Sequence, residues 1–171
     1  MTAGLARTMA ICLLVLLLPA CTNPFAEKKL PPPTEIEIKP AAAGAGIDLI
    51  VTASPLINPD ANGLPSPMVV RVYFLASPAN FAKANFTQLW EKDAATLGAT
   101  MLGKHELISK PSEAQRIVAK LPDGTTVIGI TGGFLNFQQA KWRAAFPLTG
   151  EPPHKLKAEL KTLAIDISVQ E

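Results

Sequence analysis

Apolar side chains recur at every second position along most of this chain from residue 47 onward. In the stretch 68–74, Met68, Val70, Val72 and Phe74 share one parity and alternate with the residues between them. Because successive side chains of a β-strand point to opposite faces, this period indicates a strand with one buried face. A chain patterned in this way is expected to build sheets that bury one face against each other.

Seven further segments carry the same alternation or a compact apolar run, which makes about eight expected strands in all. They are 47–53, 105–109, 117–121, 127–130, 142–148, 156–160 and 163–169. The last two fit a hairpin that turns near Lys161 and Thr162. One-sided alternation with polar outer positions favours antiparallel sheets packed face to face. We therefore predict an all-β fold with a helical insertion, built as a two-sheet antiparallel β-sandwich.

The insertion lies between the second and third expected strands, where the apolar spacing is helical. Its apolar residues are Phe86, Leu89, Trp90, Ala94 and Leu97. Asn85 is a good N-cap residue, Gln88 holds the capping-box position, and Gly98 suits a C-cap. Pro78 suits the first position of a short preceding helical turn. We predict that the helical insertion covers about residues 78–98.

The first 20 residues have the organisation of a secretory signal peptide. Arg7 gives a sparse positive charge, an apolar run covers 9–18, and the sequence LPAC closes the segment at Cys21. Leucine three residues before the cysteine fits a lipoprotein box, in which the Cys21 thiol receives a diacylglyceryl group and the new amine is acylated, typically with palmitate. The alternatives are a chance cysteine in an ordinary secretory peptide and an uncleaved anchor. The apolar run is about ten residues long, whereas a spanning helix needs about twenty.

The next segment, 21–46, is rich in Pro, Lys, Glu, Ala and Gly and is predicted to be a lipidated flexible tether. About 25 such residues span an r.m.s. distance of about 25–30 Å. The alternative is that Ile36 and Ile38 form a small extra strand. Thr22, rather than aspartate, follows the cysteine, which favours sorting to the outer membrane by the usual bacterial rule. We expect the sandwich domain, 47–171, to be lipid-anchored to the outer membrane and to face the periplasm.

The composition argues against several classes of function. A formal net charge of +2 is too close to neutral for a dedicated nucleic-acid binder. The two cysteines are Cys12, within the signal peptide, and Cys21, assigned to lipid, so no disulfide is expected. His105 and His154 are far apart in sequence and belong to no metal-binding or catalytic motif. We therefore expect no enzyme activity, no metal and no cofactor other than the covalent lipid on Cys21.

A long proline-rich segment, Ser54–Pro67, separates the first two strands of the domain. Its stretch Asn58 to Gly63 resembles the first half of a calcium loop, but Val69 stands where the bidentate glutamate would be needed. Turn chemistry explains the segment better. Asn and Asp side chains bond to nearby amides, Gly63 permits a positive φ, and the prolines stiffen the chain.

A stiff loop that exposes Leu56, Ile57 and Leu64 would lose little entropy on binding, so we predict a partner-binding loop. The alternative is that these apolar side chains fold back onto their own domain. In the binding interpretation, substitution of Asn58, Asp60 or Leu64 should weaken partner binding and leave thermal stability nearly unchanged.

Several of these features occur together in one known family. The stretches concerned are Asn58-Pro59-Asp60, Pro65-Ser66-Pro67 leading into Val69-Val70-Arg71-Val72-Tyr73, then Phe81, Phe86, Leu89, Leu97-Gly98 and Trp142-Arg143. Across about residues 47–169 the chain resembles the type VI secretion outer-membrane lipoproteins (TssJ, also called VasD or SciN). Two positions differ from the family pattern: Leu64 stands where arginine is expected, and Pro111-Ser112 stands where a Pro-Gly turn is expected.

The resemblance implies a transthyretin-like sandwich of two four-stranded sheets with a helical insertion. It also implies that the protein anchors a trans-envelope complex, because such lipoproteins bind the periplasmic C-terminal region of the inner-membrane subunit TssM, partly through the loop between the first two strands. The family performs no catalysis, and no small-molecule substrate is expected. The loop maps onto Ser54–Pro67, and the expected partner-binding residues are Leu56, Ile57, Asn58, Pro59, Asp60, Asn62, Gly63 and Leu64.

The alternative function is that of a periplasmic lipoprotein carrier for a small apolar ligand. Such a carrier needs a cavity between the sheets or beneath the insertion, lined by Phe86, Trp90 and their neighbours. In the interpretation that we favour, Phe81, Phe86 and Trp90 instead close one end of the sandwich. An enzyme would require clustered polar residues with shifted pKa values, which the sequence does not suggest.

Overall fold

The computed structural model describes residues 34–37 and 46–170. The predicted signal peptide, the lipidated Cys21, Ile38 and most of the predicted tether lie outside the described residues. Within the described ranges, no helix combines the length and the apolar character needed to cross a bilayer.

The described residues form strands with three short α-helices and one 3-10 helix between the third and fourth strands. The strands are β1 Thr34–Glu37, β2 Gly46–Ala53, β3 Met68–Leu75, β4 Met101–Ser109, β5 Ala114–Lys120, β6 Val127–Gly132, β7 Arg143–Pro147, β8 His154–Leu160 and β9 Ile165–Val169. The helices are α1 Ala79–Lys83, α2 Phe86–Glu91, α3 Asp93–Leu97 and the 3-10 helix η1 Gly98–Thr100.

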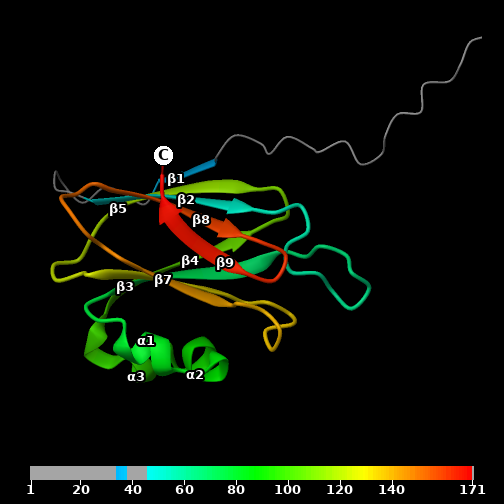
Figure 1. The fold of residues 1–171 in the computed structure, drawn as a ribbon, viewed down its shortest axis with the longest axis horizontal. Helices are drawn as coiled ribbons and strands as arrows, with labels where there is room; N and C mark the ends of the chain where they lie inside the picture. The colour runs from blue at the N-terminus through cyan, green and yellow to red at the C-terminus, as the bar shows by residue number, and fades with distance from the viewer. Residues whose placement is uncertain (1–33, 38–45, 171) are drawn as a thin grey trace, which may run out of the picture.

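The strands form two sheets, β1-β5-β2-β8-β9 and β4-β3-β6-β7, which face each other as two layers (Figure 1). The predicted β-sandwich with a helical insertion is therefore confirmed. Two details differ from the expectation of two antiparallel, four-stranded sheets. The first sheet has five strands, and two of its pairs, β1 with β5 and β2 with β8, are parallel. Parallel pairing of β2 with β8 is possible because no hairpin joins them; the chain passes through the other sheet between them.

The strand β1 lies inside the segment that the sequence predicts as a tether. It pairs with the edge of β5 over four residues, from Thr34 beside Gln115 to Glu37 beside Val118. The alternative of a small extra strand is therefore correct for Ile36. The prediction of an unbroken flexible tether up to residue 46 is wrong at these four residues.

The core lies between the sheets and follows the alternation in the sequence. In β3, Val70 and Val72 are fully buried toward this core. On the opposite face of β3, Tyr73 and Leu75 are also fully buried, in a second apolar cluster that includes Phe81 of α1. The strand is therefore buried on both faces.

The helices supply this second covering layer. They lie against the outer face of the sheet that contains β3, on the side away from β2 and β8 (Figure 1). The Phe81 ring packs on Tyr73 with the ring centroids 5.7 Å apart. The expectation that the insertion closes one end of the sandwich is wrong for Phe81, because the apolar residues Tyr73 and Leu75 give that ring a sheet face to cover.

Two arginines of this sheet fasten the helices. Arg71 Nη1 donates to the carbonyl oxygen of Trp90 at 2.7 Å and its guanidinium lies 4.2 Å from the centre of the Trp90 ring. Arg143 donates to the carbonyl oxygens of Phe81 and Ala84 at the end of α1. Carbonyls at a helix C-terminus lack intrahelical partners and attract cations. The Val-Val-Arg-Val-Tyr and Trp-Arg stretches thus hold the insertion in place.

Local capping follows the sequence closely. Asn85 and Gln88 form the predicted capping box, with both side chain to main chain bonds at 2.9 Å. Gly98 is the C-cap of α3, as predicted, and its φ of +53° is one that glycine adopts readily. Ser112 has φ +62°, so serine occupies a left-handed turn position at the place where the resemblance leads us to expect glycine.

His105 in β4 makes the stability of this sandwich depend on pH. Burial lowers its pKa below 6.5, and its Nε2 has no hydrogen-bond partner among the described residues. The unfolded chain therefore binds the proton more tightly, so the contribution of His105 is complete above about pH 6.5 and is lost as the pH falls toward the lowered pKa. We expect His105→Leu to lose less stability than the parent between about pH 7 and about pH 5, measured by urea unfolding. Parallel stability profiles for the two proteins would contradict this.

Candidate partner-binding site

The loop Ser54–Pro67 leaves the end of β2 in one sheet and enters β3 in the other. In Figure 1 it is the cyan to teal segment that projects beyond the ends of the strands. Its base is fixed, because Ser54 N–H donates to the carbonyl oxygen of Leu160 at 2.8 Å and Ser66 N–H donates to that of Ile57 at 3.2 Å. The loop therefore projects from one end of the sandwich, and main-chain hydrogen bonds hold its base in place.

Asp60 organises the tip of the loop. Its Oδ1 accepts hydrogen bonds from the main-chain N–H groups of Asn62 at 2.8 Å and Leu64 at 2.9 Å. These bonds, that of Leu64 first, hold the pKa of the Asp60 carboxyl below its usual value. Gly63 closes the turn with φ +79° and donates to the Asp60 carbonyl oxygen. The turn chemistry predicted from the sequence is present, and the tip is formed before any partner arrives.

Asn58 is buried at the base of the tip, with 2% of its surface exposed. Its Nδ2 donates to the carbonyl oxygen of Pro67 at 3.0 Å, and its Oδ1 accepts from Leu135 N–H at 2.7 Å. Its own N–H donates to the carbonyl oxygen of Thr162 at 3.1 Å. One residue therefore ties the loop to two other segments. The expectation that Asn58 could be replaced without loss of stability does not hold for a residue so placed.

The apolar loop residues divide into two kinds. Leu56 and Leu64 are 59% and 61% exposed, whereas Ile57 is 0% exposed and belongs to the core between the sheets. The alternative in which apolar residues fold back is thus correct for Ile57 alone. Of the other predicted site residues, Pro59 is partly buried, and Asn62 and Gly63 are exposed at the tip.

A further exposed leucine was missed by the sequence prediction. Leu135 is 62% exposed, and its main chain is bonded to Asn58. It lies in the connection between β6 and β7, where the stretch Gly-Gly-Phe-Leu-Asn-Phe offered a possible signal: an apolar residue in a turn, outside any strand alternation. The structure therefore associates a third exposed leucine, besides Leu56 and Leu64, with this loop.

The chemistry of this surface suits docking rather than catalysis. Asp60 is the only charged residue between Ser54 and Pro67. Among the described residues, no group of three or more His, Cys, Asp or Glu side chains could hold a metal ion. A loop that is stiffened in advance can bury its exposed leucine side chains against another protein at a small entropic cost.

The aromatic residues of the insertion pack against one another. The Phe86 ring stacks on Phe137 with centroids 4.2 Å apart and on Trp90 at 5.4 Å, and it meets Trp142 edge-on at 5.2 Å. The rings that the carrier hypothesis needs as cavity lining are therefore in mutual contact. This packing does not favour a ligand site beneath the insertion.

Comparison with known proteins gives one family. The family model described as "Type VI secretion lipoprotein, VasD, EvfM, TssJ, VC_A0113" matches residues 45–170. A search of curated proteins finds no match.

Similar solved structures come from the same secretion system. The crystal structure of the T6SS lipoprotein TssJ1 from Pseudomonas aeruginosa is 26% identical, with a TM-score of 0.71, over 74% of this chain and 97% of that one. Serratia marcescens Lip, a membrane-bound component of the type VI secretion system, is 20% identical, with a TM-score of 0.65, over 75% and 99%. A structure described as the T6SS protein TssM C-terminal domain (869-1107) from EAEC is 20% identical, with a TM-score of 0.61, over 74% and 99%.

Proposed function

Given that this chain belongs to the type VI secretion lipoprotein family, we propose that it anchors the trans-envelope complex of a type VI secretion system to the outer membrane. In this proposal the loop Ser54–Pro67 binds the periplasmic C-terminal region of the inner-membrane subunit TssM. The protein works as a structural tether and catalyses no reaction. Neither a small-molecule substrate nor a nucleic acid is part of this function.

The observation that carries the proposal is a preformed loop that exposes two leucines. Leu56 and Leu64 are more than half exposed, yet hydrogen bonds hold the main chain at both, from Leu56 N–H to Ser54 Oγ and from Leu64 N–H to Asp60 Oδ1. Exposed leucines on an ordered loop gain apolar contact on binding and lose little freedom. The similar solved structures also support a protein partner, since one of them is described as a type VI membrane complex and the description of another names TssM.

The membrane attachment is proposed from the sequence, in which LPAC ends at Cys21. A diacylglyceryl group on the thiol and an acyl chain on the amine would give the two or more chains that stable anchoring requires. Mass spectrometry of the N-terminal peptide of the mature protein tests this step. An acylated Cys21 supports it, and a free thiol at that position contradicts it.

The loop contact is tested by Leu64→Asp. A carboxylate placed in an apolar contact must be desolvated without a partner, so we expect the Kd for the cognate TssM periplasmic region to rise at least about tenfold. Thermal stability should be unchanged, because Leu64 is 61% exposed. Isothermal titration of the lipid-free domain measures the affinity.

Val169→Asp provides the matched control. Val169 is 60% exposed and lies at the opposite end of β9 from the turn that holds the loop base. Its replacement adds the same charge and should leave the affinity unchanged. Equal affinities for parent, Leu64→Asp and control would argue against the loop as the contact.

A further inference from the structure

Among the described strands β7 forms one edge of its sheet, and its pairing with β6 leaves main-chain groups without a partner in the sheet. Gly132 N–H donates to the carbonyl oxygen of Trp142, and Leu148 N–H donates to that of Thr126. In an antiparallel pair the residues that exchange hydrogen bonds alternate with residues that do not. The even-numbered residues of β7 therefore bond to β6, and the N–H and C=O groups of Arg143 and Ala145 point away from the sheet.

The strand β9 is joined to this edge by main-chain hydrogen bonds at one end. Lys141, just before β7, donates to the carbonyl oxygen of Leu163 at 2.8 Å and accepts from Ile165 N–H at 3.1 Å. Beyond this bridge a cavity of about 360 Å³ opens along β7. It is lined by Phe81, Ala82, Lys141, Arg143, Ala144, Ala145, Asp166 and Ile167.

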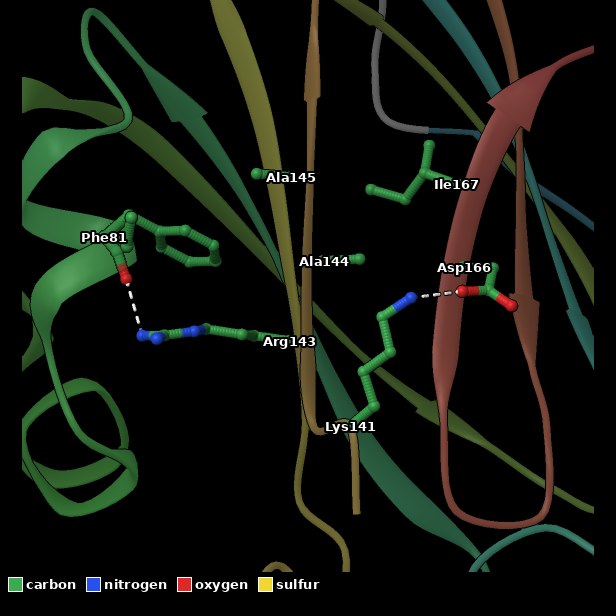
Figure 2. Close-up of a pocket in the computed structure, with 8 residues that line it drawn as sticks. Phe81, Lys141, Arg143, Ala144, Ala145, Asp166 and Ile167 are labelled. Atoms are coloured by element: carbon green, nitrogen blue, oxygen red, sulfur yellow. Dashed lines mark hydrogen bonds and ion pairs between the residues drawn. The ribbon is translucent and has the colours of Figure 1, made fainter.

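The cavity follows the strand edge and has room on both faces of it. In Figure 2, Ala145 and Arg143 lie on the side of β7 toward Phe81 of α1, whereas Ala144 points toward Ile167 of β9. Methyl side chains at two successive positions leave space for the alternating side chains of an added strand. Peptides that extend a sheet bond to its free edge and place alternate side chains in pockets on its two faces.

The charge around this groove is positive. Lys141 and Lys161 both contact the Asp166 carboxylate, at 2.5 Å and 2.7 Å. Lys161 also lies 4.0 Å from Glu159, which pairs with Lys157 at 2.6 Å, so three cations share two anions. Arg143 donates to main-chain carbonyl oxygens, which accept hydrogen bonds but do not neutralise its charge. A strand that carries a carboxylate would balance this excess.

The groove is continuous with the proposed binding loop. Lys141 bonds to Leu163, and the adjacent Thr162 accepts the N–H of Asn58, the residue that fixes the loop base. A single partner can therefore contact the loop tip and continue along β7 without crossing to another face of the domain.

We propose that β7 accepts an extended strand with an acidic side chain, donated by the same protein that binds the loop, so that the sheet gains a strand at this edge. The inference rests on the proposed function, because it concerns a second contact of that partner. The added strand can pair with β7 over a short length only. Pro147, the next residue with its main chain toward the free edge, has no N–H to donate. Arg143 and Ala145 are thus the two residues that pair with the added strand.

The test uses two substitutions at one position and the cognate TssM periplasmic region as the probe. Ala145→Pro removes an N–H that points to the free edge and leaves the bonds to β6 in place, since proline is tolerated on an edge strand. Ala145→Thr keeps the N–H and suits a strand. We expect the proline variant to bind at least about tenfold more weakly than the threonine variant at equal thermal stability.

Hydrogen exchange gives the independent measurement. The amides of Arg143 and Ala145 should exchange rapidly in the free domain and become protected in the complex with the parent or with Ala145→Thr. Lys161→Gln should weaken binding and reduce its dependence on salt. An unchanged affinity and salt dependence in that variant would overturn the acidic assignment.

The outcomes separate this inference from the function on which it rests. If the parent binds and Leu64→Asp weakens binding, but Ala145→Pro binds like Ala145→Thr and the two amides stay unprotected, the added strand is overturned and the loop contact stands. If the parent domain does not bind the TssM region at all, both proposals fail.

Discussion

The free energy of unfolding should fall by about 2–4 kcal/mol when Asn58 is replaced by alanine. The change removes the acceptor of Leu135 N–H and the donor to the Pro67 carbonyl oxygen at a site that is 2% exposed. A buried polar group that loses its partner costs about 1–3 kcal/mol. Asn58 also has φ +47°, a left-handed conformation that asparagine tolerates better than alanine does.

Urea unfolding of the lipid-free domain measures this loss, and Asn62→Ala is the matched control. Asn62 is an exposed asparagine of the same loop whose side chain can be truncated without leaving a buried group. We expect the control to change stability by less than about 0.5 kcal/mol. If Asn58→Ala unfolds at the same urea concentration as Asn62→Ala, the role of Asn58 in tying three segments together is refuted.

The strands could be predicted because one alternating pattern determines both the strand and the face that it buries. The segment MVVRVYF at 68–74 became β3, with Val70 and Val72 in the core as expected. The capping box at Asn85 was equally local, since its two hydrogen bonds depend only on residues three apart. Features defined by short-range periodicity or capping were therefore accessible from the sequence.

The placement of the helices was not local and was predicted wrongly. Tyr73 and Leu75 lie on the face of β3 that alternation assigns to solvent, and they are buried because the insertion covers them. For a related reason, the sequence favoured a flexible tether over the strand β1. Its sequence, TEIE, is short and half charged, and what makes it a strand is the available edge of β5.

The candidate site shows the same limit at the scale of one loop. The sequence identified Ser54–Pro67 as ordered and apolar, but a loop has no period that separates buried from exposed side chains. Leu56 and Ile57 are adjacent and chemically similar, yet one is 59% exposed and the other 0%. The difference is set by the main-chain bonds that turn Ile57 toward the core, from its N–H to Ser54 and from Ser66 to its carbonyl oxygen.

The contrast between exposed Leu56 and buried Ile57 gives the second prediction with a large expected effect, for Ile57→Ala. Truncating a fully buried isoleucine removes apolar contacts and leaves a cavity, which costs about 2–5 kcal/mol. We expect a loss of that size for Ile57→Ala and of less than about 0.5 kcal/mol for Leu56→Ala, both measured by urea unfolding. Two neighbouring alanine variants that lost similar stability would contradict the assignment of Ile57 as the anchor and Leu56 as part of the docking surface.

The affinity for the partner should distinguish the same two variants in the opposite order, with the larger loss in Leu56→Ala. Leu56→Ala removes contact area from the exposed surface of the loop, so its Kd for the TssM region should rise although its stability is unchanged. Ile57→Ala keeps its main-chain bonds to Ser54 and Ser66, and the tip is still held by Asp60 and Asn58. Under conditions where this variant remains folded, its Kd should therefore stay within a few-fold of the parent value. A loss of affinity in Ile57→Ala as large as that in Leu56→Ala would mean that the tip is held from the core rather than by its own hydrogen bonds.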